Sequence, residues 1–269
     1  MRSTRLALAG AAGLALALAA SSPAGAGSSS HGRTIGVARG VHASVNANQS
    51  SNWSGYNKGM LETGGGFHSI TGQWTVPTAT QHTKGQDEYS SSWIGIGGGC
   101  LDTSCTATDS TLIQAGTEQD VAADGTASYS TWYELIPAPS ISTPLAVKAG
   151  DVVSGAIAET VPGVWNITLK NVTTGKSWST TVPYTSTYGS AEWIEETPLT
   201  FGTSGAGLSS LPNLGTVHFD ASTVNGANAA LVPAEEMQLV DSNGNAIATP
   251  SAPDAERDGF NDCTWSATC

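Results

Sequence analysis

Three glutamates lie within one short stretch of the chain, Tyr188–Pro198, which reads Tyr-Gly-Ser-Ala-Glu-Trp-Ile-Glu-Glu-Thr-Pro. Side chains alternate between the two faces of a strand, so a strand here would carry two of the carboxylates on one face and one on the other. The first face holds Glu192, Ile194 and Glu196, and the second holds Ala191, Trp193 and Glu195. A carboxylate can act as general base and then general acid, but charges also protect edge strands from pairing. Glu192 is therefore a catalytic candidate that needs support from elsewhere in the chain.

Common catalytic motifs are missing from the sequence. It has no His-Glu-x-x-His pair, no Gly-x-Ser-x-Gly elbow, no phosphate-binding glycine loop and no dinucleotide fingerprint. The triplet Asp102-Thr103-Ser104 resembles the active-site triplet of aspartic proteases, but it has no second copy and lies between two cysteines. His218 alternates with apolar neighbours and reads as a surface residue. We expect no metal and no organic cofactor.

The four cysteines form two close pairs in the sequence, Cys100 with Cys105 and Cys263 with Cys269. In an exported protein such spacing favours two local disulfides, although four cysteines allow three connectivities. Zinc is the alternative. Its sites usually have tighter spacing with histidine support, and no histidine lies near these cysteines in the sequence.

The N-terminal residues are typical of export. A basic start, a short Ala- and Leu-rich run and the Ala24-Gly25-Ala26 site predict a signal peptide over residues 1–26, and hence a secreted protein. Residues 27–47 contain arginines and histidines but no acidic residue, and we expect a basic pro-segment or linker. Such a leader could dock on the acidic remainder near neutral pH and loosen in acid.

Charge excludes some partners. The formal net charge is −12 and only 12% of residues are charged, so neither nucleic acid nor an anionic membrane is an expected partner. Few Lys and Arg also means few ion pairs that acid could break, which is compatible with a protein that works at low pH. Nothing in the sequence requires more than a monomer.

Residues 48–269 carry repeated strand signals and no convincing amphipathic helix. Short alternating segments are separated by Gly, Pro, Asn and Ser turns, and Asn243-Gly244 is a strong hairpin turn. This pattern predicts one all-β domain, a sandwich or barrel, with 252–269 as an irregular tail closed by its disulfide. The predicted strands are 71–77, 127–136, 165–172, 177–182, 216–220 and 236–240.

Six blocks in this region, taken in order, resemble the glutamic peptidases, or eqolisins. They are Asn-Trp-Ser-Gly-Tyr from Asn52, Gln-Trp-Thr-Val-Pro from Gln73, Ser-Trp-Ile-Gly-Ile-Gly from Ser92, Leu-Ile-Gln-Ala-Gly from Leu112, Trp-Tyr-Glu from Trp132 and Ala-Glu-Trp-Ile-Glu from Ala191.

The resemblance implies an antiparallel β-sandwich of lectin-like or jelly-roll-like type, with a catalytic Gln and Glu on neighbouring strands. By motif these are Gln114 and Glu192, and Trp53 and Trp93 match tryptophans that line the substrate cleft. The implied protein is a secreted acid endopeptidase whose substrate is extended polypeptide, in which Glu192 acts as base and then acid while Gln114 stabilises the oxyanion.

Two features depart from the family pattern. Gly97 stands where the family often has Asp, so any hydrogen bond from that Asp must come from elsewhere or be absent, and the segment 98–111 is longer than in fungal members. Two alternatives stay open. One is a β-sandwich glycoside hydrolase with Glu134 and Glu192 as its carboxylate pair, and the other is a non-catalytic carbohydrate- or protein-binding module.

Overall fold

The computed structural model describes residues 36–38, 42–202 and 205–269. The predicted signal peptide, 1–26, and most of the predicted leader, 27–47, lie outside these ranges. The described residues are nearly all β-structure with two short helical turns, α1 (Met60–Thr63) and η1 (Pro233–Glu235). None of the helices in these ranges is long and apolar enough to cross a membrane.

The first of two large sheets, sheet I, is antiparallel throughout. Its strands lie in the spatial order β9, β8, β7, β6, β13, β4 and β18. The bounds are β4 Trp53–Gly59, β6 Ser91–Gly97, β7 Leu112–Val121, β8 Ala127–Leu135, β9 Ile141–Ser142, β13 Ser190–Glu196 and β18 Glu236–Val240.

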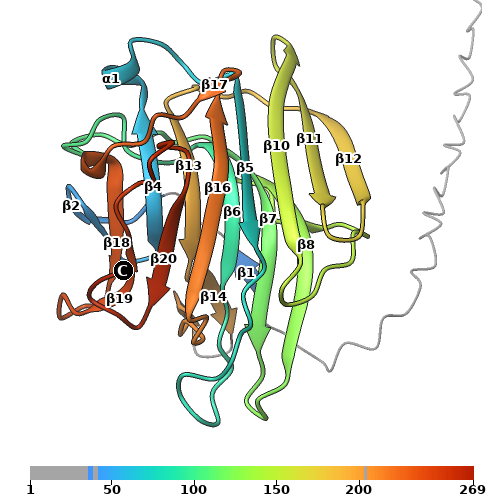
Figure 1. Ribbon diagram of the computed structural model, residues 1–269, viewed down its shortest axis with the longest axis vertical. Helices are drawn as coiled ribbons and strands as arrows, with labels where there is room; N and C mark the ends of the chain where they lie inside the picture. The colour runs from blue at the N-terminus through green and yellow to red at the C-terminus, as the bar shows by residue number, and fades with distance from the viewer. Residues whose placement is uncertain (1–35, 39–41, 203–204) are drawn as a thin grey trace, which may run out of the picture. The chain divides into compact units, whose positions relative to one another are not determined.

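The second sheet, sheet II, runs in the order β12, β11, β10, β5, β16, β20, β19 and β18, so that both sheets share β18. All these pairs are antiparallel, and the strands lie side by side in Figure 1. The predicted antiparallel β-sandwich is confirmed. The bounds are β5 Ser69–Thr75, β10 Val152–Val161, β11 Val164–Asn171, β12 Lys176–Pro183, β16 Thr216–Val224, β19 Ala246–Pro250 and β20 Phe260–Thr264.

The remaining strands are short. β2 and β3 pair with each other, β3 continues along β18 in parallel, and β17 pairs with the end of β16. β1, β14 and β15 form a separate three-stranded sheet. The bounds are β1 Gly36–Ala38, β2 Ser44–Asn46, β3 Gln49–Ser50, β14 Leu199–Gly202, β15 Gly205–Leu208 and β17 Ala227–Asn228.

The main core lies between the two sheets, where the alternation of side chains sends every second residue of each strand inward. Trp193 of sheet I and Trp74 and Trp165 of sheet II belong to it, and each is no more than 1% exposed. Burying 150–250 Å² per aromatic side chain contributes about 4–6 kcal/mol each before the entropy of ordering is subtracted. The core therefore fixes which face of β13 points inward and which points outward.

Most predicted strands are present within a few residues of their predicted bounds. The predicted hairpin is β11–β12, and the Asn243-Gly244 turn joins β18 to β19, with Gly244 at a φ of +80° that suits glycine. The irregular tail predicted over 252–269 is wrong in part. Phe260–Thr264 forms β20, which pairs with β16 on one side and β19 on the other, because its backbone fills the gap between them.

Candidate active site

The two predicted catalytic residues lie in one row across sheet I. Gly95 of β6 is paired with Gln114 of β7 on one side and with Glu192 of β13 on the other. Residues paired in this way point to the same face, and two strand spacings separate their backbones by about 9–10 Å. Gly95 has no side chain of its own, and the edge of the Trp93 ring, also on β6, lies over it, 2.8 Å from where a Cβ would be. The structure thus brings together two residues that are far apart in the sequence.

Gln114 is fully buried and its amide is oriented by a carboxylate. Glu134 is its partner on β8, and Gln114 Nε2 donates to Glu134 Oε2 at 2.9 Å. Gln114 Oε1 has no hydrogen-bond partner among the described residues. The side chain therefore has its N–H side anchored and its carbonyl oxygen unused, and one further N–H is left to donate.

Glu192 is also fully buried, and neither carboxylate oxygen has a hydrogen-bond partner among the described residues. Ser190 Oγ and the Gly99 N–H lie beside it, but they bond to each other at 3.0 Å. Burial raises the pKa of Glu192 well above its usual value, and the charge of Asp109 adds to the rise, against the influence of Ser190 and Gly99. A buried carboxyl without partners is costly, which is typical of a functional group.

A glycine-rich turn closes over Glu192. A Cβ on Gly99 would lie 2.6 Å from Glu192 Oε1 and 1.8 Å from Asn57 Oδ1, so only glycine fits there. Asn57 is the partner of Glu192 on β4 and donates from Nδ2 to the Cys100 carbonyl at 2.9 Å. Glu192 therefore lies beneath the start of the segment that follows β6.

Trp53 and Trp93 lie on the same outer face of sheet I as Glu192. Both are fully buried, and their rings meet edge to face with centroids 4.9 Å apart. Trp93 Nε1 donates to Glu196 Oε2 at 2.9 Å, and the edge of the Trp93 ring lies 2.8 Å from where a Cβ on Gly95 would be. Because both rings are fully buried, they could stack against a substrate only after the residues that cover them move away.

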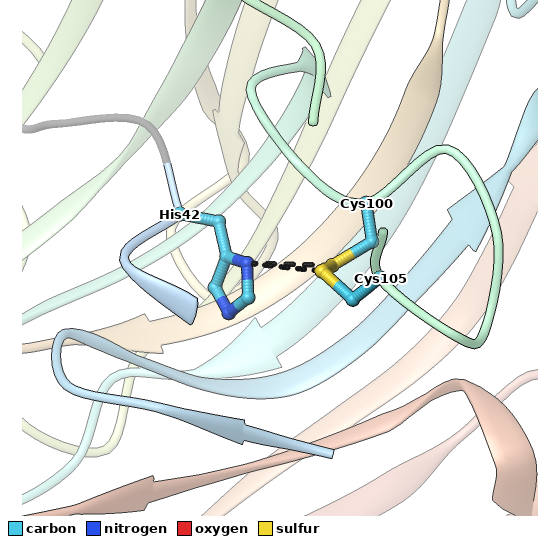
Figure 2. A group of neighbouring side chains, drawn as sticks. All are labelled: His42, Cys100 and Cys105. Atoms are coloured by element: carbon cyan, nitrogen blue, oxygen red, sulfur yellow. Dashed lines mark hydrogen bonds between the residues drawn. A yellow bond between two sulfur atoms is a disulfide. The ribbon is translucent and has the colours of Figure 1, made fainter. Parts of the chain in front are cut away.

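The disulfide and His42 form part of that cover. Cys100–Cys105 and Cys263–Cys269 are both bonded, as predicted. Figure 2 shows the His42 ring against the first disulfide, with Nδ1 3.3 Å from Cys100 Sγ. The same ring lies 5.6 Å from the Trp53 ring, and the His42 N–H donates to the Gly98 carbonyl at 2.9 Å. Burial lowers the pKa of His42 to about 4.

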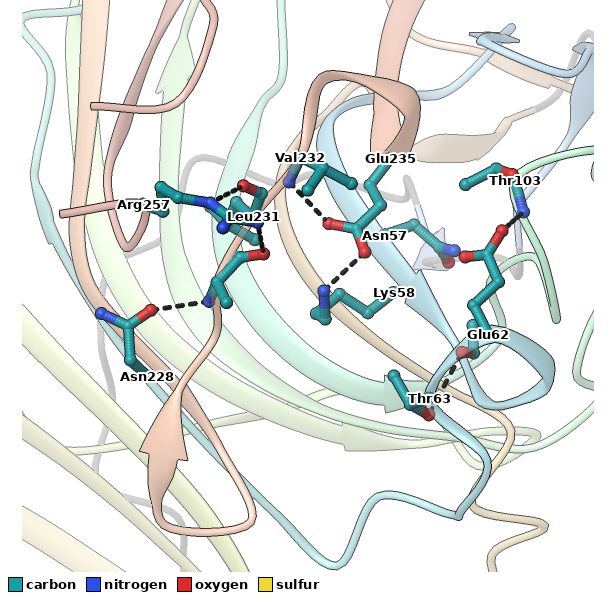
Figure 3. A network of polar contacts seen from close by, with 12 residues as sticks. Asn57, Lys58, Glu62, Thr63, Thr103, Asn228, Leu231, Val232, Glu235 and Arg257 are labelled. Atoms are coloured by element: carbon teal, nitrogen blue, oxygen red, sulfur yellow. Dashed lines mark hydrogen bonds and ion pairs between the residues drawn. The ribbon is translucent and has the colours of Figure 1, made fainter. Parts of the chain in front are cut away.

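The disulfide-bearing loop is also tied to α1. Figure 3 shows Glu62 accepting a hydrogen bond from the Thr103 N–H, at 2.8 Å. The Leu61 N–H donates to the Leu101 carbonyl at 3.0 Å. Next to Asn57, Lys58 forms an ion pair with Glu235 instead of approaching Glu192. The loop is therefore held from two directions over the outer face of sheet I.

The other face of β13 carries a separate carboxyl group in the interior of the sandwich. Ser92 Oγ donates to Glu195 Oε2 at 2.6 Å, and Ser54 Oγ donates to Asp262 Oδ1 at 2.9 Å. Burial raises the pKa of Asp262 to about 7 and that of Glu195 well above its usual value, with the charge of Asp262 adding to the latter. Glu195 and Glu192 thus belong to different environments although they are close in sequence.

The remaining sequence candidates do not join the row. Asp102 accepts a hydrogen bond from the Ser104 N–H, and His218 is exposed beside Asn261. Among the described residues two groups have ligand atoms close enough for a metal ion, and neither includes Gln114 or Glu192. The first is His42 with Cys100 and Cys105, whose sulfurs are bonded to each other, and the second is Asp220 with Asp254 and Asp258.

Sequence reasoning missed Gly95, Gly99, Asn57 and Asp109 as parts of the site. Gly95 lies in the Ser-Trp-Ile-Gly-Ile-Gly motif, but its place between Gln114 and Glu192 depends on register across three strands. The only sequence signal for Gly99 was the run of three glycines from Gly97. Nothing local marked Asn57 or Asp109, because both act through contacts with distant segments.

The chain is similar to several characterised peptidases. A sequence profile of the peptidase A4 family matches residues 51–258. Aspergillopepsin-2 from Aspergillus niger is 24% identical over 234 residues, which cover 78% of this chain and 77% of that protein. A scytalido-glutamic peptidase solved with a transition-state analogue inhibitor has a TM-score of 0.61 and 20% identity, covering 80% of this chain and 98% of that one. Aspergilloglutamic peptidase from Aspergillus niger has a TM-score of 0.50 and 26% identity over 66% of this chain and 99% of that one.

Proposed function

The chain belongs to the peptidase A4 family and is a glutamic-type peptidase, and from this premise we propose that Gln114 and Glu192 are its catalytic pair. The observation that carries the proposal is the row in which Gln114 and Glu192 flank Gly95, a residue without a side chain, on one face of sheet I. A carbonyl, an N–H and a carboxylate on one face of a sheet are the groups that a water-mediated attack on a peptide bond requires.

In the proposed reaction Glu192 takes a proton from a water molecule as that water attacks the peptide carbonyl carbon. Gln114 donates its free N–H to the oxygen on which negative charge develops, and its carbonyl oxygen orients the water. Glu192 then gives the proton to the amine as the C–N bond breaks. The products are a carboxylic acid and an amine, and no proton is left over.

The protonation state of Glu192 depends on the segment that covers the outer face of sheet I. Glu192 can act as a base only when ionised, and burial raises its pKa. Hydration of the outer face of sheet I would remove part of that burial and lower the pKa toward the usual range. Opening of the segment that holds His42 and the disulfide would therefore be needed both for substrate entry and for ionisation. An optimum well below neutral remains a prediction.

Substrate would be an extended polypeptide lying on the outer face of sheet I, with Trp53 and Trp93 against its side chains. The competing pair for sugar cleavage has little support from the geometry. Glu134 is hydrogen-bonded to Gln114 and lies three strands from Glu192, with backbones about 14 Å apart.

The decisive experiment compares the proteolysis of a denatured protein across acid pH by the wild type, Glu192→Gln and Gln114→Ala. We expect no measurable turnover for Glu192→Gln and a loss of about 10²–10³-fold in kcat for Gln114→Ala. Glu195→Gln is the matched control, because it changes a buried glutamate of the same strand that faces away from the row. Full activity in both test variants would exclude the catalytic pair, and cleavage of polysaccharide alone would favour the glycosidase alternative.

We further propose export, with residues 1–26 as signal peptide, 27–47 as leader and 48–269 as the peptidase domain, acting as a monomer. The chain segment 42–47 already contacts the domain through β2 and His42. N-terminal sequencing of the mature protein from a culture supernatant tests the boundaries, and size-exclusion chromatography with light scattering tests the monomer. A mature chain that begins before residue 27 would exclude the predicted signal peptide.

A further inference from the structure

Asp109 connects two distant segments of the chain through one buried carboxylate. The residue is 4% exposed and lies near the end of the loop that carries Cys100 and Cys105. Its Oδ1 accepts from the Thr111 N–H at 2.9 Å and from the Thr111 hydroxyl at 3.1 Å, and the Thr187 hydroxyl also donates to it. Its Oδ2 accepts from the Gly189 N–H at 2.7 Å. Four donors on one carboxylate fix its position closely.

The second of these segments leads directly into the strand that carries Glu192. Gly189 is the residue before β13 and lies three positions before Glu192. The backbone of Asp109 also reaches the turn above Glu192, because its N–H donates to the Gly99 carbonyl at 2.8 Å. Gly99 in turn bonds to Ser190 Oγ. Asp109 thus holds the two backbone segments that border the Glu192 carboxyl group.

Two glycines make room for this carboxylate. A Cβ on Gly189 would lie 2.6 Å from Asp109 Oδ2, and a Cβ on Gly97 would lie 3.2 Å from the same atom. Gly97 also has a φ of +90°, and its Cβ would meet the Thr111 carbonyl oxygen at 2.0 Å. No side chain can therefore stand at Gly97 in this backbone. The carboxylate that approaches position 97 belongs to Asp109, twelve residues later in the chain.

Asp109 is also a charged neighbour of Glu192, and its negative charge raises the pKa of the Glu192 carboxyl. The other strands that flank Glu192 offer little charge on this face. Gly95 and Asn57 are uncharged, Glu134 lies beyond Gln114, and Lys58 is paired with Glu235. On the covering segment, His42 lies against the disulfide.

We propose that Asp109 is a positioning residue for Glu192, which aligns the entrance of β13 and the turn above the Glu192 carboxyl group and brings a carboxylate to that end of the strand. This inference rests on the proposed catalytic role of Glu192. The proposed role of Asp109 assigns a function to the long loop at 98–111, which the disulfide alone does not explain. The Cys100–Cys105 disulfide closes the first part of the loop, and the Asp109 carboxylate lies near the loop's C-terminal end.

The test uses the full-length protein with Asp109→Asn, which keeps the side-chain shape but removes the charge. We expect the acid limb of kcat/KM against pH to move to lower pH, because an ionised Glu192 no longer faces a like charge. We also expect kcat to fall by about tenfold at the optimum with KM little changed, because the Glu192 carboxyl is less well aligned. An acid limb that stays in place, or one that moves to higher pH, would overturn the proposal.

Asp102→Asn is the matched control. Asp102 lies in the same loop and also accepts a hydrogen bond from a residue two places later, but it is not among the groups that shift Glu192. The acid limb of Asp102→Asn should coincide with that of the wild type. If it shifts as far as that of Asp109→Asn, the shift results from disruption of the loop and the proposal is wrong. Thr187→Val keeps the charge but removes one donor, so it should lower kcat without moving the limb. That variant tests the alignment even if Asp109→Asn does not fold, and an unchanged kcat would contradict it.

Failure of this inference is distinguishable from failure of the catalytic pair. If Glu192→Gln is inactive while Asp109→Asn has the wild-type pH profile, only the role of Asp109 is wrong. If Glu192→Gln is fully active, the catalytic pair is wrong and any change in Asp109→Asn has another cause.

Discussion

Replacing Asp262 by Asn should make the stability of the fold much less dependent on pH. The carboxyl group is fully buried between the sheets, where Ser54 Oγ donates to Oδ1 and Oδ2 has no hydrogen-bond partner among the described residues. Burial raises its pKa from 3.8 to about 7 in the folded protein. Below pH 3.8 both the folded and the unfolded states hold the proton, and the side chain has no pH-dependent effect.

Between these two pH values the unfolded chain releases the proton while the folded chain keeps it, so stability falls as pH rises. A difference of about three pH units multiplied by 1.36 kcal/mol gives a loss of roughly 4 kcal/mol that is complete above pH 7. For a domain of this size that corresponds to about 8–16 °C in Tm. Asn at this position can still accept the bond from Ser54, but it carries no charge at any pH.

Urea unfolding at pH 3 and at pH 7.5, for wild type and Asp262→Asn, measures this effect. Any constant cost of the new NH₂ group cancels when the difference between the two pH values is compared. We expect the drop in unfolding free energy from pH 3 to pH 7.5 to be about 4 kcal/mol smaller in the variant. An equal drop in both proteins would refute the reasoning.

Asp241 provides a control of opposite sign. Hydrogen bonds from Asn245 lower its pKa, so its stabilising effect is present near neutral pH and is lost as pH falls. Asp241→Asn should therefore weaken the fold more at pH 7.5 than at pH 3. If the pH dependence of the unfolding free energy changed in the same direction in Asp262→Asn and Asp241→Asn, a general charge effect, and not the burial of Asp262, would govern it.

Three further predictions concern the outer face of sheet I. Gly95→Ala places a methyl group 2.8 Å from the edge of the Trp93 ring and 3.3 Å from Gln114 Cβ. We expect at least a tenfold loss of kcat/KM with a cost of about 1–3 kcal/mol in stability, measured by kinetics and urea unfolding. Because burial lowers the pKa of His42 from 6.5 to about 4, burial of this ring should become roughly 3 kcal/mol less favourable as pH falls through this range. His42→Phe should therefore remove the pH dependence of limited proteolysis near residue 42, and an unchanged profile would contradict it. Glu134→Gln lets the Gln114 amide turn over, so kcat should fall more than KM rises, and wild-type kinetics would argue against an orienting role.

Local patterns were sufficient to predict much of the fold. The alternation around Trp193 and around Trp165 correctly gave strands, and it correctly separated the faces of Glu192 and Glu195. Both disulfides were predicted from the spacing of the cysteines together with the expected export of the protein. These features depend on residues close in sequence, where side-chain periodicity and turn chemistry act directly.

The arrangement of the site depended on long-range register, which no local pattern encodes. The motifs around Gln114 and Glu192 gave two separate candidates. Their assignment to one site came from the resemblance to the glutamic peptidases, not from side-chain periodicity. β20 was missed because its five residues only become a strand when β16 and β19 leave a gap for them. The burial of Trp53 and Trp93 was equally hidden, since the residues that cover them come from the leader and from the loop after β6.

The insertion of β13 between β4 and β6 has a consequence during synthesis. β4 and β6 precede β13 by about a hundred residues or more, yet neither pairs with the other, and each bonds to β13. A ribosome that has delivered only the first half of the chain has made Gln114 but leaves β6 with an open edge where Glu192 belongs. The order of the strands therefore means that the row of Gln114, Gly95 and Glu192 can form only after the polypeptide has been extended past Glu196.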